Sequence, residues 1–291
     1  MKKALVLNRG FMAFLVSALI AAALTGTVSC SKKAPSAEKT VIKVGVTSDN
    51  FILWDSVQAE LDARGKAIKI EPVVFDGGAT INSSTANGEL DANAFQHYAF
   101  FNQDIKDKKL EDKLTVAGET LIVPLSLFVN KDKGYTKTAD LPDGASIAIP
   151  DDPTNQGRAL SLLVSAGLIT IREEAGHNGF LADITGNPRN FKFVELYGPQ
   201  IPRALPDVDA AVINCGIAVD AGLDPINDPT FKIDIDPANP ALKPFINIIV
   251  TNTKGKDSQA IKDFVDAYRS KRVAETILEV YRKAAVPVFD Y

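Results

Sequence analysis

Short runs of β-branched residues alternate with segments of helical periodicity along most of this 291-residue chain. The segment 41–47 (VIKVGVT) is such a run, and 68–75 is the next one. Between them, the segment 52–64 places apolar residues four positions apart, which predicts an amphipathic helix. A strand, a helix and a second strand in this order predict parallel strands joined by a right-handed crossover, and therefore an α/β fold.

A second set of alternating patterns follows, with a strand predicted at 145–150 and a helix at 154–166. The chain returns to a predicted strand at 245–251. Prolines recur between residues 225 and 244, which predicts an irregular surface loop. We therefore expect two α/β lobes. Their ranges are 41–126 together with 246–291 for the first lobe, and 127–245 for the second.

The N-terminus has the three parts of a bacterial export signal. Residues 1–9 are basic, the apolar run 11–24 follows, and small residues lead from it to Cys30. The run is short for a membrane span, which needs roughly 20 apolar residues. We expect residues 1–29 to be removed as a signal peptide.

Cys30 determines which kind of export signal this is. The segment 27–30 (TVSC) resembles a lipobox, in which the cysteine is lipidated and becomes the first mature residue, although Thr27 stands where leucine is usual. Acyl chains on Cys30 would anchor the exported protein to a bacterial cell membrane, facing the periplasm or the surface, with 30–40 as a flexible tether. The alternative is a plain secretory signal with an incidental cysteine.

The composition excludes several classes of function. The 32 Lys and Arg against 36 Asp and Glu give a formal net charge of −4, and no basic block follows the N-terminus. We therefore expect no nucleic-acid partner. The 2 His and 2 Cys supply too few ligands for a metal cluster and too few thiols for a disulfide framework. We expect no metal and no cofactor.

The chain also lacks the sequence motifs of hydrolytic enzymes. Neither GxSxG nor HExxH is present. Cys215, at the end of a predicted strand, would be a candidate nucleophile if His97 lay beside it. The alternative is a small buried residue next to a pocket, and on that interpretation the protein is not an enzyme.

The segment 88–98 (GELDANAFQHY) collects amide, aromatic and imidazole side chains just past a predicted strand. His97 stands among Phe95, Tyr98 and Phe100, where it would hydrogen-bond a ligand while the rings hold an apolar side chain. The alternative is a histidine at the start of a helix, packed among core aromatic residues.

The segment 149–160 (IPDDPTNQGRAL) leaves a strand, turns through prolines and enters a helix. The N-terminus of a helix offers unpaired N–H groups and a positive dipole end to an anion. Arg158, in the predicted first turn, adds a planar fork that suits a carboxylate, although an arginine there opposes the dipole. The alternative is an ion pair of Arg158 with Asp151 or Asp152.

The segment 207–214 (DVDAAVIN) ends a predicted buried strand in an amide. Asn214 has both a donor and an acceptor, which would bind the amine and the carboxylate of a ligand. The alternative is that Asn214 caps the helix that follows.

Five segments, in this order, resemble the NlpA-type lipoproteins, and the resemblance runs from about Val41 to the C-terminus. They are GELDANAFQH, IPDDPTNQGRAL with a following GLI, the DIxxNP run at 183–188, DVDAAVIN and NIIVT. The family implies a two-lobed type II periplasmic-binding-protein fold with its ligand cleft between the lobes. It also implies a monomeric receptor that delivers methionine, or a closely related amino acid, to the permease and ATPase of an ABC importer.

The resemblance also implies ligand-binding residues at the matching motif positions. It implies that Arg158 binds the ligand carboxylate. The remaining ligand residues are Phe95, His97 and Phe100 around the side chain, and Asn214 and Asn247 at the amino-acid head group.

Three segments depart from the family pattern. Phe100 replaces a usual tyrosine, Gly216 and Ile217 replace an amide and an aromatic residue, and 76–78 lacks the aromatic residue that commonly follows the second strand. These changes remove polar groups and reshape the cleft. The alternative function is therefore a surface lipoprotein with a degenerate cleft that acts through protein–protein interaction.

Overall fold

The computed structural model describes residues 39–291. The predicted signal peptide 1–29, the lipidation site Cys30 and most of the tether 30–40 lie outside the described residues. None of the helices between residues 39 and 291 has the length and apolar character that crossing a membrane requires.

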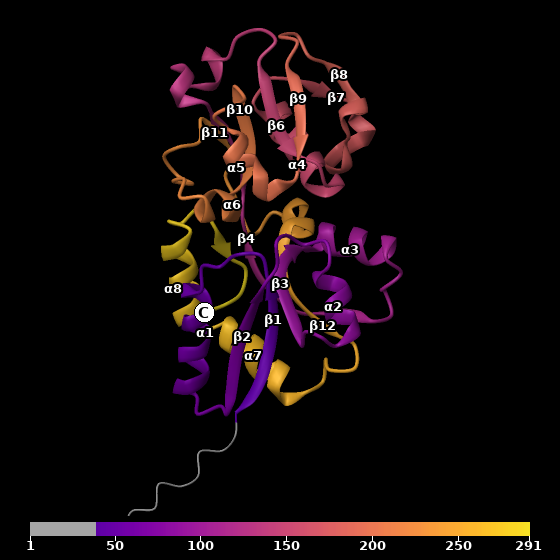
Figure 1. Ribbon diagram of the computed structural model, residues 1–291, viewed down its shortest axis with the longest axis vertical. Coiled ribbons are helices and arrows are strands. Elements are labelled where there is room, and N and C mark those ends of the chain that lie inside the picture. The colour runs from indigo at the N-terminus through magenta and orange to yellow at the C-terminus, as the bar shows by residue number, and fades with distance from the viewer. Residues whose placement is uncertain (1–38) are drawn as a thin grey trace, which may run out of the picture. The chain divides into compact units, whose positions relative to one another are not determined.

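The first lobe is built on a six-stranded mixed sheet (Figure 1). In order across the sheet, its strands are β13 (Val286–Pro287), β4 (Leu114–Ile122), β12 (Ile246–Asn252), β3 (Ala92–His97), β1 (Thr40–Val46) and β2 (Ile68–Val74). Strand β1 is parallel to β2 and β3, as the alternating pattern predicts. Strand β12, which the chain forms when it returns to this lobe, runs antiparallel to both of its neighbours, β3 and β4.

Helices cover both faces of this sheet (Figure 1). They are α1 (Ile52–Ala63), α2 (Ile81–Asn87), α3 (Tyr98–Asp107), α7 (Gln259–Tyr268) and α8 (Lys271–Val280). Helices α1, α7 and α8 pack together on one face, where Trp54, Leu61 and Phe264 belong to the core. Helices α2 and α3 lie on the other face, where Phe101 packs with Ile248 of β12.

The second lobe has a five-stranded sheet and a separate antiparallel pair (Figure 1). The five strands, in order, are β11 (Phe231–Lys232), β5 (Leu125–Val129), β10 (Ala210–Asn214), β6 (Ser146–Pro150) and β9 (Lys192–Leu196), and the pair is β7 (Thr170–Ile171) with β8 (Ile184–Gly186). Strands β10, β6 and β9 are mutually parallel, whereas β5 is antiparallel to β10. The prediction of a two-lobed α/β fold is confirmed.

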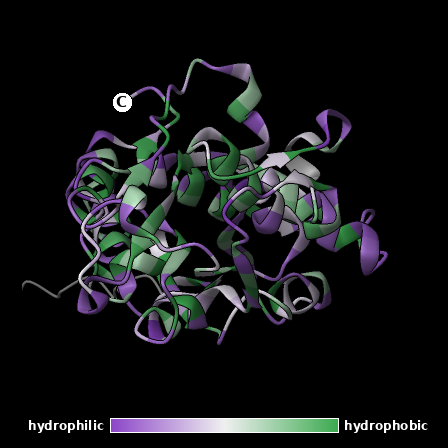
Figure 2. Ribbon diagram, turned by 90° about the horizontal axis from the view of Figure 1, so that it is seen from above, coloured by the Kyte–Doolittle hydropathy of each residue, from purple (hydrophilic) through white to green (hydrophobic). Residues whose placement is uncertain are grey.

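Helices cover both faces of the second sheet as well. Helix α4 (Pro153–Ser165) packs on one face, and α5 (Ile201–Ala204) and α6 (Cys215–Asp220) pack on the other. Short 3-10 helices connect these elements: η1 (Lys131–Lys133), η2 (Thr138–Asp140), η3 (Glu173–Asn178), η4 (Leu181–Asp183), η5 (Gly198–Gln200) and η6 (Pro240–Phe245). Apolar residues concentrate on the strands, and polar residues dominate the outer turns (Figure 2).

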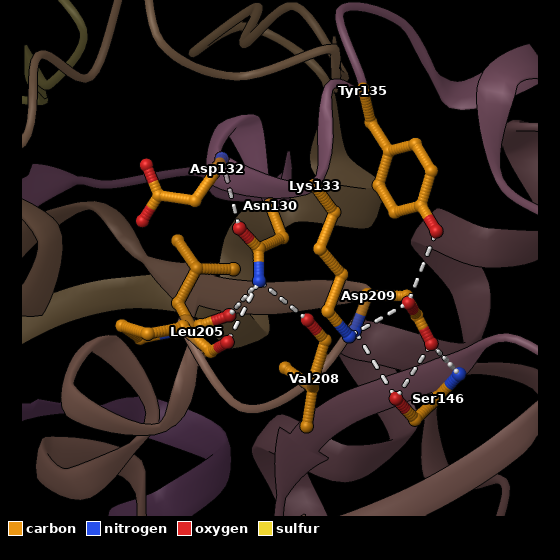
Figure 3. A network of polar contacts seen from close by, with 9 residues as sticks. Asn130, Asp132, Lys133, Tyr135, Ser146, Leu205, Val208 and Asp209 are labelled. Carbon is orange, nitrogen blue, oxygen red and sulfur yellow. Dashed lines mark hydrogen bonds and ion pairs between the residues drawn. The ribbon is translucent and has the colours of Figure 1, made fainter.

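Asp209, just before β10, ties three segments of the second lobe together (Figure 3). Its carboxylate accepts hydrogen bonds from the backbone N–H and the hydroxyl of Ser146 (2.7 and 2.8 Å), and from Lys133 Nζ (2.9 Å) and Tyr135 Oη (3.3 Å). These bonds hold the start of β6, the end of η1 and the residues just after it against the start of β10.

The chain changes sheets twice. The apolar stretch that includes β4 and β5 is interrupted at Val123 and Pro124, where proline has no N–H to donate to a ladder. The second change falls between η6 and β12. We propose these two points as the hinge crossings between the lobes.

The proline-rich segment 225–244 was expected to be irregular, and this expectation is wrong in part. Phe231–Lys232 forms β11, which pairs with β5. Pro240 starts η6, and a proline is tolerated at the start of a helix because the first N–H groups have no helical partner.

Candidate functional site

A cavity of about 960 Å³ lies between the two lobes and is lined by residues of both. This volume is at the upper end of the range for small-molecule sites, roughly 300–1,000 Å³. The ligand residues predicted from the sequence all line it: Phe95, His97, Phe100, Arg158, Asn214 and Asn247. The fold therefore brings together side chains from distant parts of the chain.

His97 ends β3 and caps the N-terminus of α3, and only 5% of it is exposed. The Phe100 N–H donates to Nδ1 (3.1 Å), so the neutral ring carries its proton on Nε2, which donates to Asn155 Oδ1 (3.3 Å). Burial and then the charge of Arg158 lower the pKa of His97 to about 3, against the opposing effect of the Asn155 bond. His97 is therefore a neutral donor at physiological pH, both at a helix start and on the cavity wall.

Arg158 lies in the second turn of α4, which begins at Pro153, and not in the first turn as predicted. Its Nη2 donates to the carbonyl oxygen of Val123 (2.8 Å) and its Nη1 to Asn155 Oδ1 (3.2 Å). The guanidinium carbon lies 4.8 Å from the centre of the Phe245 ring. Burial lowers the pKa of Arg158 to about 10, so the side chain remains charged at neutral pH.

Within the described part of the chain, no ion pair neutralises this charge. The Asp152 carboxylate is engaged at the start of α4, where it accepts hydrogen bonds from Thr154 and from the backbone and side-chain nitrogens of Asn155. The ion pair of Arg158 with Asp151 or Asp152 is therefore not formed. The charge of Asp152 favours the charged form of Arg158, but a partly buried cation with no direct ion pair is costly, and a carboxylate ligand would supply that pair.

Asn155 is the central residue of the site, and the sequence analysis missed it. Its Oδ1 accepts hydrogen bonds from His97 Nε2, Arg158 Nη1 and Asn214 Nδ2 (2.9 Å). Its Nδ2 donates to both carboxylate oxygens of Asp152 (3.2 and 3.0 Å), which fixes the orientation of the amide. The spacing of Asp152 and Asn155 places an amide on the first turn of α4, but this spacing is typical of an ordinary capped helix and does not by itself indicate a binding residue.

Asn214 ends β10 and precedes α6, yet its side chain makes no capping hydrogen bond to that helix. The capping alternative is therefore wrong, because the side-chain nitrogen donates to Asn155 instead. Asn247 pairs with His97 in the antiparallel register of β12 and β3, and its carbonyl oxygen accepts from Thr120 Oγ1 (2.8 Å). The side chains of Asn214 and Asn247 thus reach the cavity from different lobes.

Aromatic rings form one wall of the cavity. The Phe95 and Phe100 rings meet edge to face, with centroids 5.8 Å apart. His97 meets both Phe100 and Phe245 in the same manner, at 6.5 and 5.8 Å. Such edge contacts hold the rings in fixed orientations and leave an apolar surface toward the cavity.

Tyr197 is a second residue that the sequence analysis missed. It follows β9 in the second lobe, lines the cavity, and donates from its hydroxyl to the carbonyl oxygen of Asp76 in the first lobe (3.2 Å). No local pattern in the sequence signals this contact. The segment 76–78, which lacks an aromatic residue of its own, therefore receives one from the opposite lobe.

Neither nucleophilic nor metal chemistry is supported at this site. Cys215 is buried, and burial raises its pKa to about 12 against the opposing charge of Lys232, so the thiol stays protonated. Among the side chains that the structure describes, which are those of 39–176 and 179–291, no group of three or more His, Cys, Asp or Glu is placed to hold a metal ion. The residues around Asn155 supply hydrogen-bond donors and the Arg158 cation, and aromatic rings lie beside them, which is the composition of a binding site.

Comparisons with known proteins agree with this geometry. The family model for the NlpA lipoproteins matches residues 42–289. Lipoprotein 28 of Escherichia coli O157:H7 is 36% identical over 266 residues, which is 91% of this chain and 94% of that protein. The D-methionine-binding lipoprotein MetQ of Salmonella typhimurium is 37% identical over 247 residues, 84% of this chain and 87% of that protein.

A solved structure shows the same fold. A nutrient-binding protein from Burkholderia cenocepacia, bound to methionine in that structure, superposes with a TM-score of 0.77 at 34% identity, over 85% of this chain and all of the other. The resemblance inferred from five sequence segments is confirmed, as is the expectation of an exported, lipid-anchored protein, although Cys30 itself is outside the described residues. The chain therefore belongs to the NlpA lipoprotein family, whose members are solute-binding proteins of ABC importers and not enzymes.

Proposed function

We propose that this lipoprotein binds methionine, or a closely related amino acid, in the cavity between its lobes. It then delivers this ligand, as a monomer anchored through Cys30, to the permease and ATPase of an ABC importer. The observation that carries the proposal is the Arg158 guanidinium, which is partly buried, charged and without a carboxylate partner among the described residues. The relatives named for methionine binding support the choice of ligand.

The head group of a zwitterionic amino acid matches the donors and acceptors of the cavity. The ligand carboxylate pairs with Arg158 and accepts from the donors that converge on Asn155 Oδ1. The side-chain oxygens of Asn214 and Asn247 accept from the ligand amine. Because these two residues come from different lobes, binding the head group holds the lobes together.

The ligand side chain fits the aromatic wall. Phe95 and Phe100 supply apolar surface. His97 is uncharged at neutral pH, so its ring extends this surface, and no charge has to be removed from water when the ligand side chain binds. A thioether makes favourable contacts with aromatic rings, which favours methionine over a branched aliphatic side chain.

Isothermal titration calorimetry with L-methionine, D-methionine and a panel of other amino acids tests this function. Native mass spectrometry, run first, identifies any ligand that co-purifies and reports the oligomeric state. We expect Arg158→Ala to weaken binding by about 100-fold or more while the protein stays folded, because a buried charge contact is worth several kcal/mol. Arg203→Ala is the matched control, since Arg203 is an exposed cation at the edge of the same cavity.

Binding of L- or D-methionine that is lost in Arg158→Ala and kept in Arg203→Ala supports the proposal. A different amino acid bound with the same dependence on Arg158 keeps the mechanism and changes the substrate. If no amino acid binds to the wild-type protein, the surface lipoprotein with a degenerate cleft becomes the better explanation.

A further inference from the structure

The turn at Gly77 and Gly78 in the first lobe is shaped to receive two aromatic side chains, one from each lobe. A Cβ atom on Gly77 would lie 0.9 Å from the Tyr197 hydroxyl oxygen and 2.2 Å from Cζ of the same ring. A Cβ atom on Gly78 would lie 2.4 Å from Cε2 of Phe95. Gly77 also has a φ of +89°, a conformation that side chains other than glycine rarely adopt.

Tyr197 reaches this turn from the other side of the cavity. Its hydroxyl donates to the Asp76 carbonyl oxygen, and its ring lines the cavity together with Phe95. The lobes also touch through the Ser48 hydroxyl, which donates to Asp220 of the second lobe (2.8 Å). The Tyr197 ring belongs to the second lobe, and the turn at Gly77 and Gly78 that receives it belongs to the first. The part of the cavity wall that they form together therefore exists only when the two lobes are in contact.

We propose that Tyr197 is a specificity-determining residue, which completes the apolar side-chain pocket from the second lobe, and that Gly77 is a positioning residue that leaves room for it. This inference rests on the function proposed above. A ligand with a long apolar side chain therefore gains contacts on closure that a small amino acid does not gain.

The experiment compares affinities for L-methionine and L-alanine, because the two probes share a head group and differ only in the side chain. Calorimetry on the full mature lipoprotein gives the ratio of the two dissociation constants for each variant. We expect Tyr197→Ala to reduce the preference for methionine about tenfold, the scale on which apolar contacts discriminate between side chains. Tyr197→Phe keeps the ring and is expected to retain most of the preference.

Gly77→Ala is expected to reduce the preference as Tyr197→Ala does, because the added Cβ displaces the ring. In the double variant, the second change has no further effect on the ratio, since the ring is already absent. Gly134→Ala is the control for backbone strain alone, because Gly134 has a φ of +83° and nothing lies within 4 Å of its Cβ position. This control is expected to leave the ratio unchanged.

The outcomes separate this inference from the proposed function. Wild-type binding of methionine with an unchanged ratio in Tyr197→Ala overturns the inference alone. If Gly77→Ala and Tyr197→Ala reduce the preference for methionine additively in the double variant, the role of Gly77 in leaving room for the Tyr197 ring is overturned. Absence of any amino-acid binding by the wild-type protein overturns the proposed function and this inference with it.

Discussion

His97 Nε2 and Asn155 Oδ1 lie 3.3 Å apart, and this hydrogen bond joins the two lobes across the cavity. The same oxygen accepts from Arg158 and Asn214 of the second lobe. Three donors thus converge on one neutral amide oxygen, which has only two lone pairs. A ligand carboxylate is the stronger acceptor, and we expect it to draw these donors away from Asn155.

Replacement of Asn155 by Asp is expected to weaken methionine binding at pH 7 by about tenfold or more. The introduced carboxylate pairs with Arg158 and repels the carboxylate of the ligand. Calorimetry with L-methionine at pH 7 measures this effect.

Asn155→Ala removes the same acceptor without adding a charge, and it serves as the matched control. Its affinity for L-methionine should fall less than that of Asn155→Asp, because no added charge repels the ligand carboxylate. Equal affinities of Asn155→Asp and wild type at pH 7 would contradict the competition that we describe.

His97 is expected to make the protein less stable as the medium becomes acidic. Its folded-state pKa of about 3 lies below the ordinary value of 6.5, so the unfolded chain binds the proton more tightly. The contribution to stability is therefore complete above pH 6.5 and is lost progressively as the pH falls toward 3. The slope approaches about 1.4 kcal/mol per pH unit within this window.

Urea unfolding at pH 7, 6 and 5 measures this slope, and His97→Gln should reduce it. Glutamine retains a donor for Asn155 but does not titrate. A variant whose stability falls with pH as steeply as that of the wild type would show that His97 is not buried as a neutral ring.

Asp209→Asn is expected to lower the free energy of unfolding by about 1–3 kcal/mol, because several hydrogen bonds to the carboxylate are weakened. Burial raises the pKa of Asp209, but the bonds from Ser146 and Lys133 outweigh it and lower the pKa to about 2. This contribution is present above pH 3.8 and is lost as the pH falls toward 2.

Differential scanning calorimetry at pH 7 compares this variant with Asp207→Asn, an exposed neighbour, for which we expect almost no change. Ligand affinity should be preserved in both variants, since neither carboxylate lines the cavity. Equal stabilities of the two variants would show that the network of Figure 3 does not stabilise the second lobe.

The residues that end strands were the most predictable part of the site. Asn214 ends the apolar strand β10 and His97 ends the mixed strand β3, and in an open α/β sheet the residues at these strand ends face the ligand crevice. The alternation of strands and helices predicted both lobes for the same reason, because a buried parallel strand needs an apolar run with a helix beside it. Sequence patterns describe relationships between residues that are close in the sequence, and these strands, helices and strand ends depend on such residues.

Asn155 and Tyr197 could not be predicted in this way. The position of Asn155 next to a capping Asp152 is typical of an ordinary helix start, and its role arises from partners on other elements. Tyr197 meets Asp76 across 121 residues of sequence and between two lobes. No periodicity or spacing encodes a contact of this kind, which depends on how the lobes are packed together.

The hydrogen bond from Arg158 to the Val123 carbonyl attaches the cation that we propose as the carboxylate-binding group to a crossing between the lobes. A point near a rotation axis travels a short arc, whereas a point at the rim of the rotating body travels a long one. Arg158 should therefore keep almost the same position whether the lobes are apart or together, and an arriving carboxylate meets a cation already in place. Tyr197, on a contact that only closure makes, should arrive afterwards, so the protein tests the charge of a ligand before it tests the side chain.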